Sequence, residues 1–278
     1  MKIIADSSAS RTEWALVDGA TVVEHAFTKG LNPFFHTRRD ISHSIRLELP
    51  EAFFKRRWER IHFYGAGCTS PEKKKIVEAS LVAQFKTPVT VESDLLGAAR
   101  GLLINEAGIA CILGSGSNSC YYDGRAIVKN VRSLGYILGD EGSGAVLGKH
   151  FLNGIFKSWL DHGLRTEYLA WSGLTYSEII DKVYRQPMPN RYLASIVPFI
   201  SQRVLRYPEL EQMVVDSFRD FLRLNVVPYR RPDLPVNFVG GVANAFAVQL
   251  YKAIDAEGLM FGKIVHRPVR GLMKFHLQ

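Results

Sequence analysis

Residues 109–124 read IACILGSGSNSCYYDG, and this stretch decides the fold. Ile109–Gly114 is apolar and predicts a strand, and Ser117–Tyr122 predicts a second strand. Glycine and serine form the turn between them, while Asp123-Gly124 is a favoured hairpin turn into a third strand over Arg125–Val131. The stretch therefore predicts three successive strands joined by tight turns.

The beginning of the chain has the same order of features. Lys2–Ser8 predicts a buried strand, and Thr12–Asp18 follows as a second strand. Asp18-Gly19 predicts a hairpin turn into a third strand over Thr21–Phe27. The two patterns lie about 108 residues apart, which is longer than the period of a solenoid repeat. We therefore expect two related domains, which also suits a chain of 278 residues.

The rest of the chain predicts a mixture of strands and helices. Asp94 stands where a predicted strand meets a predicted helix, and its side chain can cap that helix. The expected strands are Arg60–Gly65, Pro88–Ser93 and Pro235–Gly240. The expected helices are the stretch around His36–Leu47, Pro71–Phe85, Asp94–Ile104, Ser143–Leu160, Thr175–Tyr184, Arg191–Arg206, Leu210–Val227 and Ala243–Ala256, followed by a terminal segment over Gly271–Leu277. These elements together predict an α/β protein.

Composition excludes several classes of protein. Hydrophobic residues make up 47% and charged residues 22%, as in ordinary globular chains. The mean hydropathy is -0.01, and no apolar run of about 18 residues predicts a membrane span. An acid at the sixth residue comes too early for a signal-peptide core. The three cysteines form no CxxC pattern, so we expect a reduced, cytoplasmic setting.

The net charge of +8 is spread unevenly, with +2 over residues 1–108 and +6 over residues 109–278. The densest basic runs, Lys55–Arg57 and Lys73–Lys75, are short and flanked by acids, as on solvated helix faces. No tract alternates basic and aromatic residues as a nucleic-acid platform does. We therefore expect no nucleic-acid partner, and the positive balance also suits an anionic small molecule.

The small-residue turns are the best candidates for a binding site. A turn of glycine and serine exposes consecutive backbone N–H groups, and such a nest binds phosphate oxygens. Asp6 precedes the first turn and can hold Mg²⁺, usually through water, while Arg11 can neutralise phosphate. The alternative is two tight hairpins without a ligand. Neither a P-loop nor a GxGxxG fingerprint is present, because Ser143 and His150 break the first pattern and the second lacks its third glycine.

Six segments occur in an order that resembles a known family. They are Ala5–Thr12 (ADSSASRT), Gly30–Pro33 (GLNP), Glu92–Asp94 (ESD), Leu113–Ser119 (LGSGSNS), Gly135–Gly144 (GYILGDEGSG) and Val239–Ala243 (VGGVA). The chain resembles the N-acetylglucosamine kinase branch of the BadF/BadG/BcrA/BcrD ATPase family, within the actin–hexokinase–Hsp70 superfamily. The resemblance spans nearly the whole chain and includes a terminal segment over Pro268–Leu277.

The resemblance implies a kinase built from two ribonuclease-H-like domains of the actin/hexokinase type, with a cleft between them. The N-terminal domain would comprise residues 1–108 and the C-terminal segment 266–278. The other domain would comprise residues 109–265 and include a helical insertion. The implied partners are ATP, Mg²⁺ and a sugar that is phosphorylated at its 6-hydroxyl, and family members commonly form homodimers.

The resemblance also assigns roles to individual residues. The phosphates and the metal would be held by Asp6 (Mg²⁺), Ser8, Ala9, Ser10 and Arg11 of the first turn and by Gly114, Ser115 and Gly116 of the second, with Gly240, Gly241 and Asn244 near the adenosine. The sugar would contact Asn32, Asp94, Ser117, Asn118, Ser133, Gly135, Tyr136 and Asp140.

Asp94 is the expected catalytic base. A sugar hydroxyl is a poor nucleophile, so an ionised carboxylate has to orient it and accept its proton. The helix N-terminus predicts a low pKa for Asp94. The simpler interpretation is a helix cap alone. Asp140 suits a sugar hydroxyl in the same way, whereas Glu141 is as well explained by bracing the turn.

Departures from the family pattern leave alternatives open. Bacterial relatives usually have glycine, serine, threonine and lysine where this chain has Ser8, Ala9, Ser10 and Arg11. A side chain in place of glycine at the phosphate favours a second interpretation, a sugar or nucleotide sensor without catalysis. A third is a redox ATPase that activates a dehydratase, which needs paired cysteines. The sequence does not choose among N-acetylglucosamine, glucosamine, N-acetylmuramate and glucose.

Overall fold

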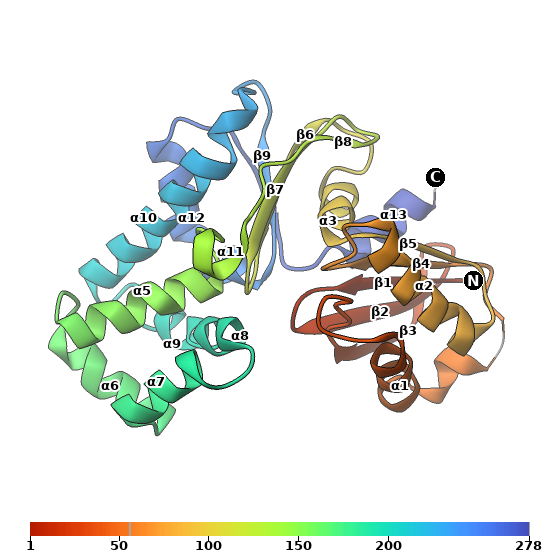
Figure 1. The fold of residues 1–278 in the computed structure, drawn as a ribbon. Coiled ribbons are helices and arrows are strands. Elements are labelled where there is room, and N and C mark those ends of the chain that lie inside the picture. The colour runs from red at the N-terminus through yellow and green to blue at the C-terminus, as the bar shows by residue number, and fades with distance from the viewer. Residues whose placement is uncertain (56, 278) are drawn as a thin grey trace. The chain divides into compact units, whose positions relative to one another are not determined.

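The computed structural model describes residues 1–55 and 57–277, which form two compact units. The first comprises Met1–Ala110, Tyr122–Val128 and the segment from Arg267 onward, and the second comprises Cys111–Tyr121 and Lys129–His266. In each unit a sheet packs against helices (Figure 1). The predicted domain boundaries at 108/109 and 265/266 stay a proposal.

The sheet of the first unit has the strand order β3-β2-β1-β4-β5. Its strands are β1 (Lys2–Ser7), β2 (Arg11–Asp18), β3 (Thr21–Lys29), β4 (Ile61–Gly65) and β5 (Val89–Ser93). The first three strands are antiparallel neighbours, whereas β1, β4 and β5 run parallel. The carboxyl ends of the three parallel strands therefore meet at one edge of the sheet.

Helices cover both faces of this sheet, and the period-two alternation of β1 explains why. Ile3 and Ala5 join a core with Trp14 and Phe63, whereas Ile4 faces the opposite side with Leu272. The elements around the sheet are α1 (Arg38–Glu48), η1 (Glu51–Phe54), α2 (Pro71–Phe85), α3 (Asp94–Leu103) and the C-terminal α13 (Val269–His276). The chain's two ends thus pack in the same unit.

The second sheet repeats the strand order of the first. Read from the other edge, it is β8-β7-β6-β9-β10, which matches β3-β2-β1-β4-β5 position by position. Its strands are β6 (Gly108–Leu113), β7 (Ser117–Tyr122), β8 (Ile127–Lys129), β9 (Val236–Val239) and β10 (Phe261–Val265). The predicted duplication of the strand–turn–strand pattern and the α/β class are confirmed.

The second unit is richer in helices than the sequence predicted. Its helical elements are α4 (Gly135–Leu138), α5 (Gly144–Lys157), α6 (His162–Ser172), α7 (Tyr176–Tyr184), α8 (Pro189–Ala194), α9 (Val197–Ser201), α10 (Pro208–Asn225), η2 (Val227–Tyr229), α11 (Gly241–Ala245) and α12 (Ala247–Ala256). None of the described helices has the length and apolar character needed to cross a bilayer.

At least four predicted elements have the wrong bounds, and one of them, the helix expected over Ala243–Ala256, is divided into α11 and α12 at Phe246. The helix expected over 143–160 ends at Lys157, because Ser158 adopts a left-handed conformation at its C-cap. The helix expected over 191–206 is divided into α8 and α9, because Pro198 donates no amide and clashes with the preceding turn. The strand expected over 125–131 keeps only three residues, and β10 was missed because it is a half-exposed edge strand with a weak apolar pattern.

Candidate active site

The first small-residue turn connects β1 to β2, and a side chain fills it. The backbone N–H of Ser8 donates to the carbonyl oxygen of Arg11 at 2.9 Å, which closes the turn. The Ser8 hydroxyl donates to the same oxygen at 3.0 Å. It also accepts from the backbone N–H groups of Ser10 and Arg11, at 3.4 and 3.3 Å. Two amides of the predicted phosphate nest thus already converge on an oxygen atom of the turn itself.

Tight backbone packing holds this turn in place. A Cβ on Gly30 would lie 2.5 Å from the carbonyl oxygen of Ser8 and 2.7 Å from that of Ala9, so only glycine fits there. The Arg11 guanidinium stacks over the Phe27 ring at 4.7 Å. The charge of Arg11 is therefore present beside the turn, on an exposed side chain.

Asp6 lies near the end of β1, next to two further carboxylates. Burial raises the pKa of Asp6 to about 8, and the charges of Asp94 and Glu13 raise it further, while Arg267 opposes them. A carboxylate whose negative charge is unfavourable until a cation neutralises it suits Mg²⁺. Among the described residues, no three acidic, histidine or cysteine side chains converge as a metal cage. Mg²⁺ is commonly held by one or two carboxylates with water and phosphate, so Asp6 fits that mode.

Asp94 is the first residue of α3 and follows the last residue of β5. The expectation that Asp94 caps the helix is wrong, because the Ser93 hydroxyl takes that place and accepts from the N–H of Leu96 at 3.2 Å. Asp94 Oδ1 accepts from the N–H of Leu95 at 2.9 Å. The low pKa expected for Asp94 is also wrong, because burial outweighs these backbone hydrogen bonds and raises it to about 6. Asp94 is therefore mostly ionised at neutral pH.

The strand register brings Asp6 and Asp94 to the same edge of the first sheet. Ser7 of β1 pairs with Gly65 of β4, which pairs with Ser93 of β5. Neighbouring strands are about 4.8 Å apart, so the ends of β1 and β5 are separated by roughly 10 Å. Both carboxylates thus border one short stretch of the sheet edge.

Asn32 lies on the loop between β3 and α1 and is 9% exposed. Its Oδ1 accepts from the N–H of Phe34 at 2.9 Å, which fixes the orientation of the amide. Within residues 1–55 and 57–277, its Nδ2 has no hydrogen-bond partner and is free to donate. A Cβ on Gly67 would overlap the amide of Asn32, so Gly67 supports this side chain. Sequence reasoning missed Gly67; its signal was the Gly-Ala-Gly run that begins at Gly65, the last residue of β4.

The second turn, Gly114–Ser117, connects β6 to β7 and contains no side chain that fills it. The first amides of α5 donate to the carbonyl oxygens of Gly114 and Ser115, at 2.8 and 3.1 Å. The N–H of Gly114 donates to the carbonyl oxygen of Gly116 at 2.9 Å. In the part of the chain that the structure describes, the N–H groups of Ser115 and Gly116 have no partner. Two consecutive free amides make an open anion nest.

Asp140 ties this turn to the predicted sugar-binding segment, residues 133–140. Asp140 Oδ1 accepts from the N–H of Ser117 at 3.2 Å, and its own N–H donates to the carbonyl oxygen of Ser133 at 2.9 Å. Burial raises the pKa of Asp140 to about 6, helped by the charge of Glu141. A Cβ on Gly116 would lie 3.0 Å from Asp140 Oδ2, so glycine makes room for the carboxylate.

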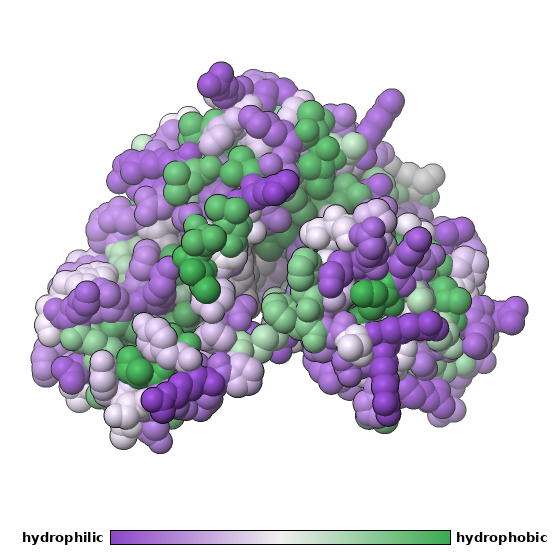
Figure 2. Space-filling model, in the orientation of Figure 1, coloured by the Kyte–Doolittle hydropathy of each residue, from purple (hydrophilic) through white to green (hydrophobic). Residues whose placement is uncertain are grey.

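The rest of the segment 133–140 is more exposed than Asp140, which is buried. Gly135 and Tyr136 belong to the short helix α4 and are partly exposed, whereas Leu134, Ile137 and Leu138 expose 62, 72 and 75% of their surface. Figure 2 shows the apolar side chains that gather over α4.

The remaining predicted residues fall into two groups in the second unit. Asn118 Oδ1 accepts from the N–H of Ser119 at 2.9 Å and from Asn130 Nδ2, also at 2.9 Å. Gly240 has a φ of +130°, and a Cβ there would overlap the carbonyl oxygen of Leu113 at the end of β6. Gly241 and Asn244 belong to α11, are both exposed, and lie close to Gly240 in the chain.

Comparison with known proteins gave matches among solved structures. No protein-family model and no curated protein sequence matches the chain. A solved structure from Porphyromonas gingivalis, described as a putative N-acetylglucosamine kinase, is 42% identical with a TM-score of 0.96. The match covers 100% of this chain and 99% of that one.

Two further matches are more distant. A putative N-acetylglucosamine kinase from Chromobacterium violaceum is 19% identical with a TM-score of 0.73, over 100% of this chain and 98% of the other. A ROK family glucokinase from Streptomyces griseus, solved with glucose and AMPPNP, is 14% identical with a TM-score of 0.57, over 99 and 97% of the two chains. These two show that the fold is shared.

Proposed function

The chain belongs to the N-acetylglucosamine kinase-like family of the actin–hexokinase–Hsp70 superfamily, and we propose that it transfers the γ-phosphoryl group of ATP to the 6-hydroxyl of N-acetylglucosamine or a related amino sugar. The observation that carries the proposal is the pair of carboxylates Asp6 and Asp94 at one edge of the first sheet, one suited to Mg²⁺ and the other ionised at neutral pH. Sugar kinases need a carboxylate for the metal and another for the hydroxyl.

Asp94 acts as the general base in this proposal. Its Oδ1 is held by the N–H of Leu95, which leaves Oδ2 to accept a hydrogen bond from the sugar hydroxyl. The proton passes to the carboxylate as the oxygen attacks phosphorus, and ADP leaves. A pKa of about 6 suits the task, because the group is ionised at pH 7 and still basic enough to take the proton.

Asp6 and the two turns bind the nucleotide. Mg²⁺ would supply positive charge against the negative charge that develops during transfer. Asp6 would hold this ion, and Arg11 would add a positive charge beside Ser8, Ala9 and Ser10 of the first turn. The free amides of Ser115 and Gly116, with Gly114, would bind phosphate oxygens directly. The adenosine would be bordered by Gly240, Gly241 and Asn244. A Cβ on the exposed Gly241 would meet nothing within 4 Å, so the surface there is open to a ligand.

The sugar would be held by polar groups that are already oriented. The free Nδ2 of Asn32 can donate to a hydroxyl or carbonyl oxygen. Asp140 can accept a hydrogen bond from a sugar hydroxyl, and it already contacts Ser117, the neighbour of Asn118 in the chain. Ser133, Gly135 and Tyr136 would also contact the sugar, from the segment that ends at Asp140. We propose that the protein acts in the cytoplasm, where ATP is available and cysteines stay reduced, and that it forms a homodimer.

A panel of sugars with ATP and Mg²⁺, monitored for ADP, tests this function. N-acetylglucosamine, glucosamine, N-acetylmuramate and glucose should be tested separately at equal concentrations, and a reaction without sugar gives the background. We expect ADP release with at least one amino sugar, and release at least a hundredfold slower when Asp94→Asn replaces the wild-type chain. Background ADP production with all four sugars would contradict the proposal.

A sensor that binds without catalysis is the second candidate, and the Ser8 hydroxyl within the first turn favours it. Calorimetry that detects sugar binding, together with no turnover in Mg²⁺ or Mn²⁺, would establish that function instead. The redox-ATPase interpretation is disfavoured, because Cys68, Cys111 and Cys120 are fully buried and burial raises the pKa of Cys68 to about 12. Such thiols do not present a cluster at a surface.

A further inference from the structure

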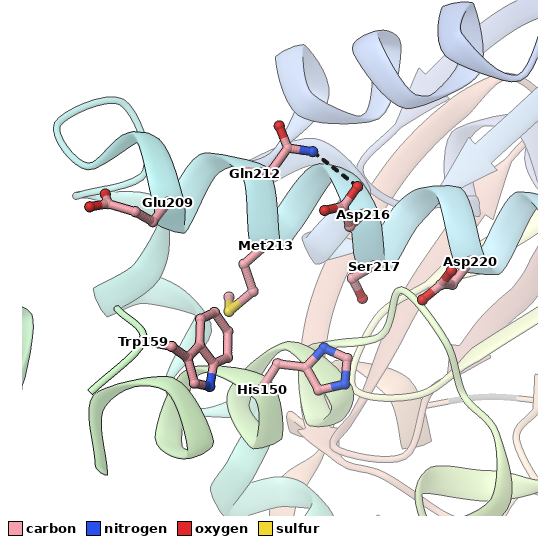
Figure 3. Close-up of a pocket in the computed structure, with 8 residues that line it drawn as sticks. All are labelled: His150, Trp159, Glu209, Gln212, Met213, Asp216, Ser217 and Asp220. Carbon is pink, nitrogen blue, oxygen red and sulfur yellow. Dashed lines mark hydrogen bonds between the residues drawn. The ribbon is translucent and has the colours of Figure 1, made fainter. Parts of the chain in front are cut away.

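A pocket of about 660 Å³ lies between α5 and α10, and the proposed kinase site uses none of its residues. Figure 3 shows α10 on one side and α5 on the other. The pocket is lined by Glu209, Gln212, Met213, Asp216, Ser217 and Asp220 from α10, facing His150 of α5 and Trp159. Its volume falls within the range of small-molecule sites.

Ser217 is the first sign that this pocket takes a ligand. Its side chain is 2% exposed and points from α10 toward His150 (Figure 3). Its hydroxyl has no hydrogen-bond partner among the residues that the structure describes. A buried hydroxyl without a partner costs stability, so such groups are rare unless something else binds them. Helix propensity does not explain a serine here either, because alanine would serve the helix better.

The chemistry of the lining indicates a cation. Glu209, Asp216 and Asp220 present carboxylates, and no lysine or arginine lines the pocket in the described part of the chain. Arg219, outside the lining, approaches Asp216 Oδ1 at 3.8 Å. Burial and the charge of Lys149 keep the pKa of His150 below its usual value, so the ring is neutral at neutral pH and can accept a hydrogen bond. This lining stands out on a chain with a net charge of +8.

The donors on the pocket walls already have partners. Gln212 Nε2 donates to Asp216 Oδ1 at 3.0 Å, and Trp159 Nε1 donates to Asn153 Oδ1 at 3.0 Å. Lys149 lines only a smaller adjoining cavity of about 200 Å³, which shares His150, Ser217 and Asp220 with the pocket. The polar groups that a ligand meets in the larger pocket are therefore mainly hydrogen-bond acceptors, so the ligand itself must supply the hydrogen-bond donors.

The spacing of the acids decides what kind of cation fits. The described residues contain no group of three ligands that could hold one metal ion, so the carboxylates do not converge. They instead form a row along α10, because Glu209, Asp216 and Asp220 are separated by seven and four residues. At 1.5 Å per residue, the intervals are about 10 Å and about 6 Å. Met213 and the Trp159 ring supply apolar surface alongside this row (Figure 3).

From this geometry we propose that the pocket binds a linear aliphatic polyamine. Its ammonium groups would pair with the separated carboxylates, its methylene chain would lie against Met213 and Trp159, and one ammonium would donate to the Ser217 hydroxyl. Amines of this kind are protonated at neutral pH, as lysine is. A separated row of acids with apolar surface beside it matches a chain of alternating charges and methylenes better than a compact ion.

Calorimetry with spermidine on the full chain, in 150 mM NaCl and without nucleotide, tests the proposal. Nucleotide is omitted because polyamines bind its phosphates. We expect saturable binding of one spermidine per chain, about fivefold weaker in Asp220→Asn, as for the loss of one partly exposed ion pair. Ser217→Ala should also bind more weakly, without loss of thermal stability, because the hydroxyl has no partner to lose. Asp255→Asn is the matched control, an exposed acid outside the pocket, and should bind like wild type.

The competing outcomes are distinct. Mg²⁺ at equal charge concentration should not displace spermidine, because it is compact, even where it binds elsewhere on the chain. Diacetylated spermidine should give no saturable heat, because it lacks the two terminal charges. If spermidine binds equally to wild type, Asp220→Asn and Asp255→Asn, its association is general charge screening and the proposal fails. It fails equally if wild type gives no saturable binding. The assay contains neither ATP nor sugar, so its result is independent of the kinase assay.

Discussion

The two small-residue turns occupy the same position in two sheets of the same strand order, yet they differ in what their amides do. In the first turn the Ser8 hydroxyl accepts from the amides of Ser10 and Arg11. In the second turn the amides of Ser115 and Gly116 are free in the described structure. One turn is filled by its own side chain, and the other is open to an anion.

The carboxylates are divided in a complementary way. The first unit carries Asp6 and Asp94 at one sheet edge, each with a raised pKa. The second unit contributes Asp140, which accepts from the N–H of Ser117 and so orders the open turn. We propose a division of labour, in which the first unit supplies the groups for metal binding and proton transfer and the second supplies most of the amide contacts to phosphate.

The largest effect should come from Asp94→Asn. If the first unit holds the chemistry, loss of the base should lower kcat by about 10²- to 10⁴-fold. The amide side chain can still cover the N-terminus of α3, so folding and binding should persist. Steady-state ADP release measures kcat, and calorimetry measures the sugar and nucleotide Kd. A variant that keeps more than a tenth of wild-type kcat would show that the base lies elsewhere.

Gly116→Ala should act on the second turn. Its Cβ would lie 3.0 Å from Asp140 Oδ2, so the carboxylate must shift by a few tenths of an ångström, which weakens the hydrogen bond that Oδ1 accepts from the N–H of Ser117. The displaced carboxylate holds the turn and the sugar less well, and the net value of one hydrogen bond, about 0.5–1.5 kcal/mol, sets the scale: we expect roughly 2- to 13-fold weaker binding of ATP and sugar. Gly114→Ala is the matched control, because its Cβ would meet nothing closer than 3.9 Å. Equal losses in both variants would mean that Asp140 does not order the turn.

Mg·ATP binding should release a proton from the first unit. Asp6 has a pKa of about 8 in the folded chain against 3.8 in an unfolded one, so it is largely protonated at pH 7. Mg²⁺ needs the carboxylate, so affinity should rise by up to about tenfold per pH unit until pH 8 and then level off. Calorimetry at pH 7 in two buffers of different ionisation enthalpy counts the protons.

The stability of Asp6→Asn provides a control for the pKa itself. A raised carboxyl pKa costs stability progressively as the pH increases from about 4 to about 8, because the folded state resists ionisation. Asp6→Asn should therefore raise Tm relative to wild type at pH 8 and leave it unchanged near pH 4, and it should abolish proton release. The same Tm difference at both pH values would mean that Asp6 is ionised throughout.

Sequence reasoning succeeded where local patterns decide the structure. Strands ending near Asp6 and before Asp94 were predicted, but the parallel pairing of β1, β4 and β5, which brings the two residues to one sheet edge, was not. The duplicated strand–turn–strand pattern was predicted, because apolar runs and Asp-Gly turns mark each hairpin.

The rest depended on tertiary contacts that no local pattern contains. The pKa of Asp94 reflects burial against two helix-start amides, and the balance depends on what surrounds the carboxyl group. Asp140 has a φ of +57°, a left-handed conformation that its contacts to Ser133 and Ser117 hold in place. Because the residue is not glycine, the sequence does not indicate this conformation. The filling of the first turn depends on the rotamer of Ser8, and its sequence equally allowed an open nest.

The smallest effect, and the most direct test of the two-turn comparison, should come from Ser8→Ala. Removing the hydroxyl frees the amides of Ser10 and Arg11, and the methyl group adds no backbone flexibility, unlike glycine. A hydrogen bond of this kind is worth about 1 kcal/mol net, and both are long, so nucleotide affinity should improve about two- to fivefold. Fluorescence or calorimetric titration with a non-hydrolysable ATP analogue measures it.

Ser115→Ala supplies the matched change in the open turn, where the amides are already free and removal of a hydroxyl frees nothing. If Ser8→Ala tightens binding and Ser115→Ala does not, the Ser8 hydroxyl competes with phosphate for the amides of the first turn. A weaker affinity in Ser8→Ala would reverse that conclusion, because the hydroxyl would then be a phosphate ligand. The first turn would in that case bind the nucleotide through a side chain, whereas the second turn uses its backbone amides.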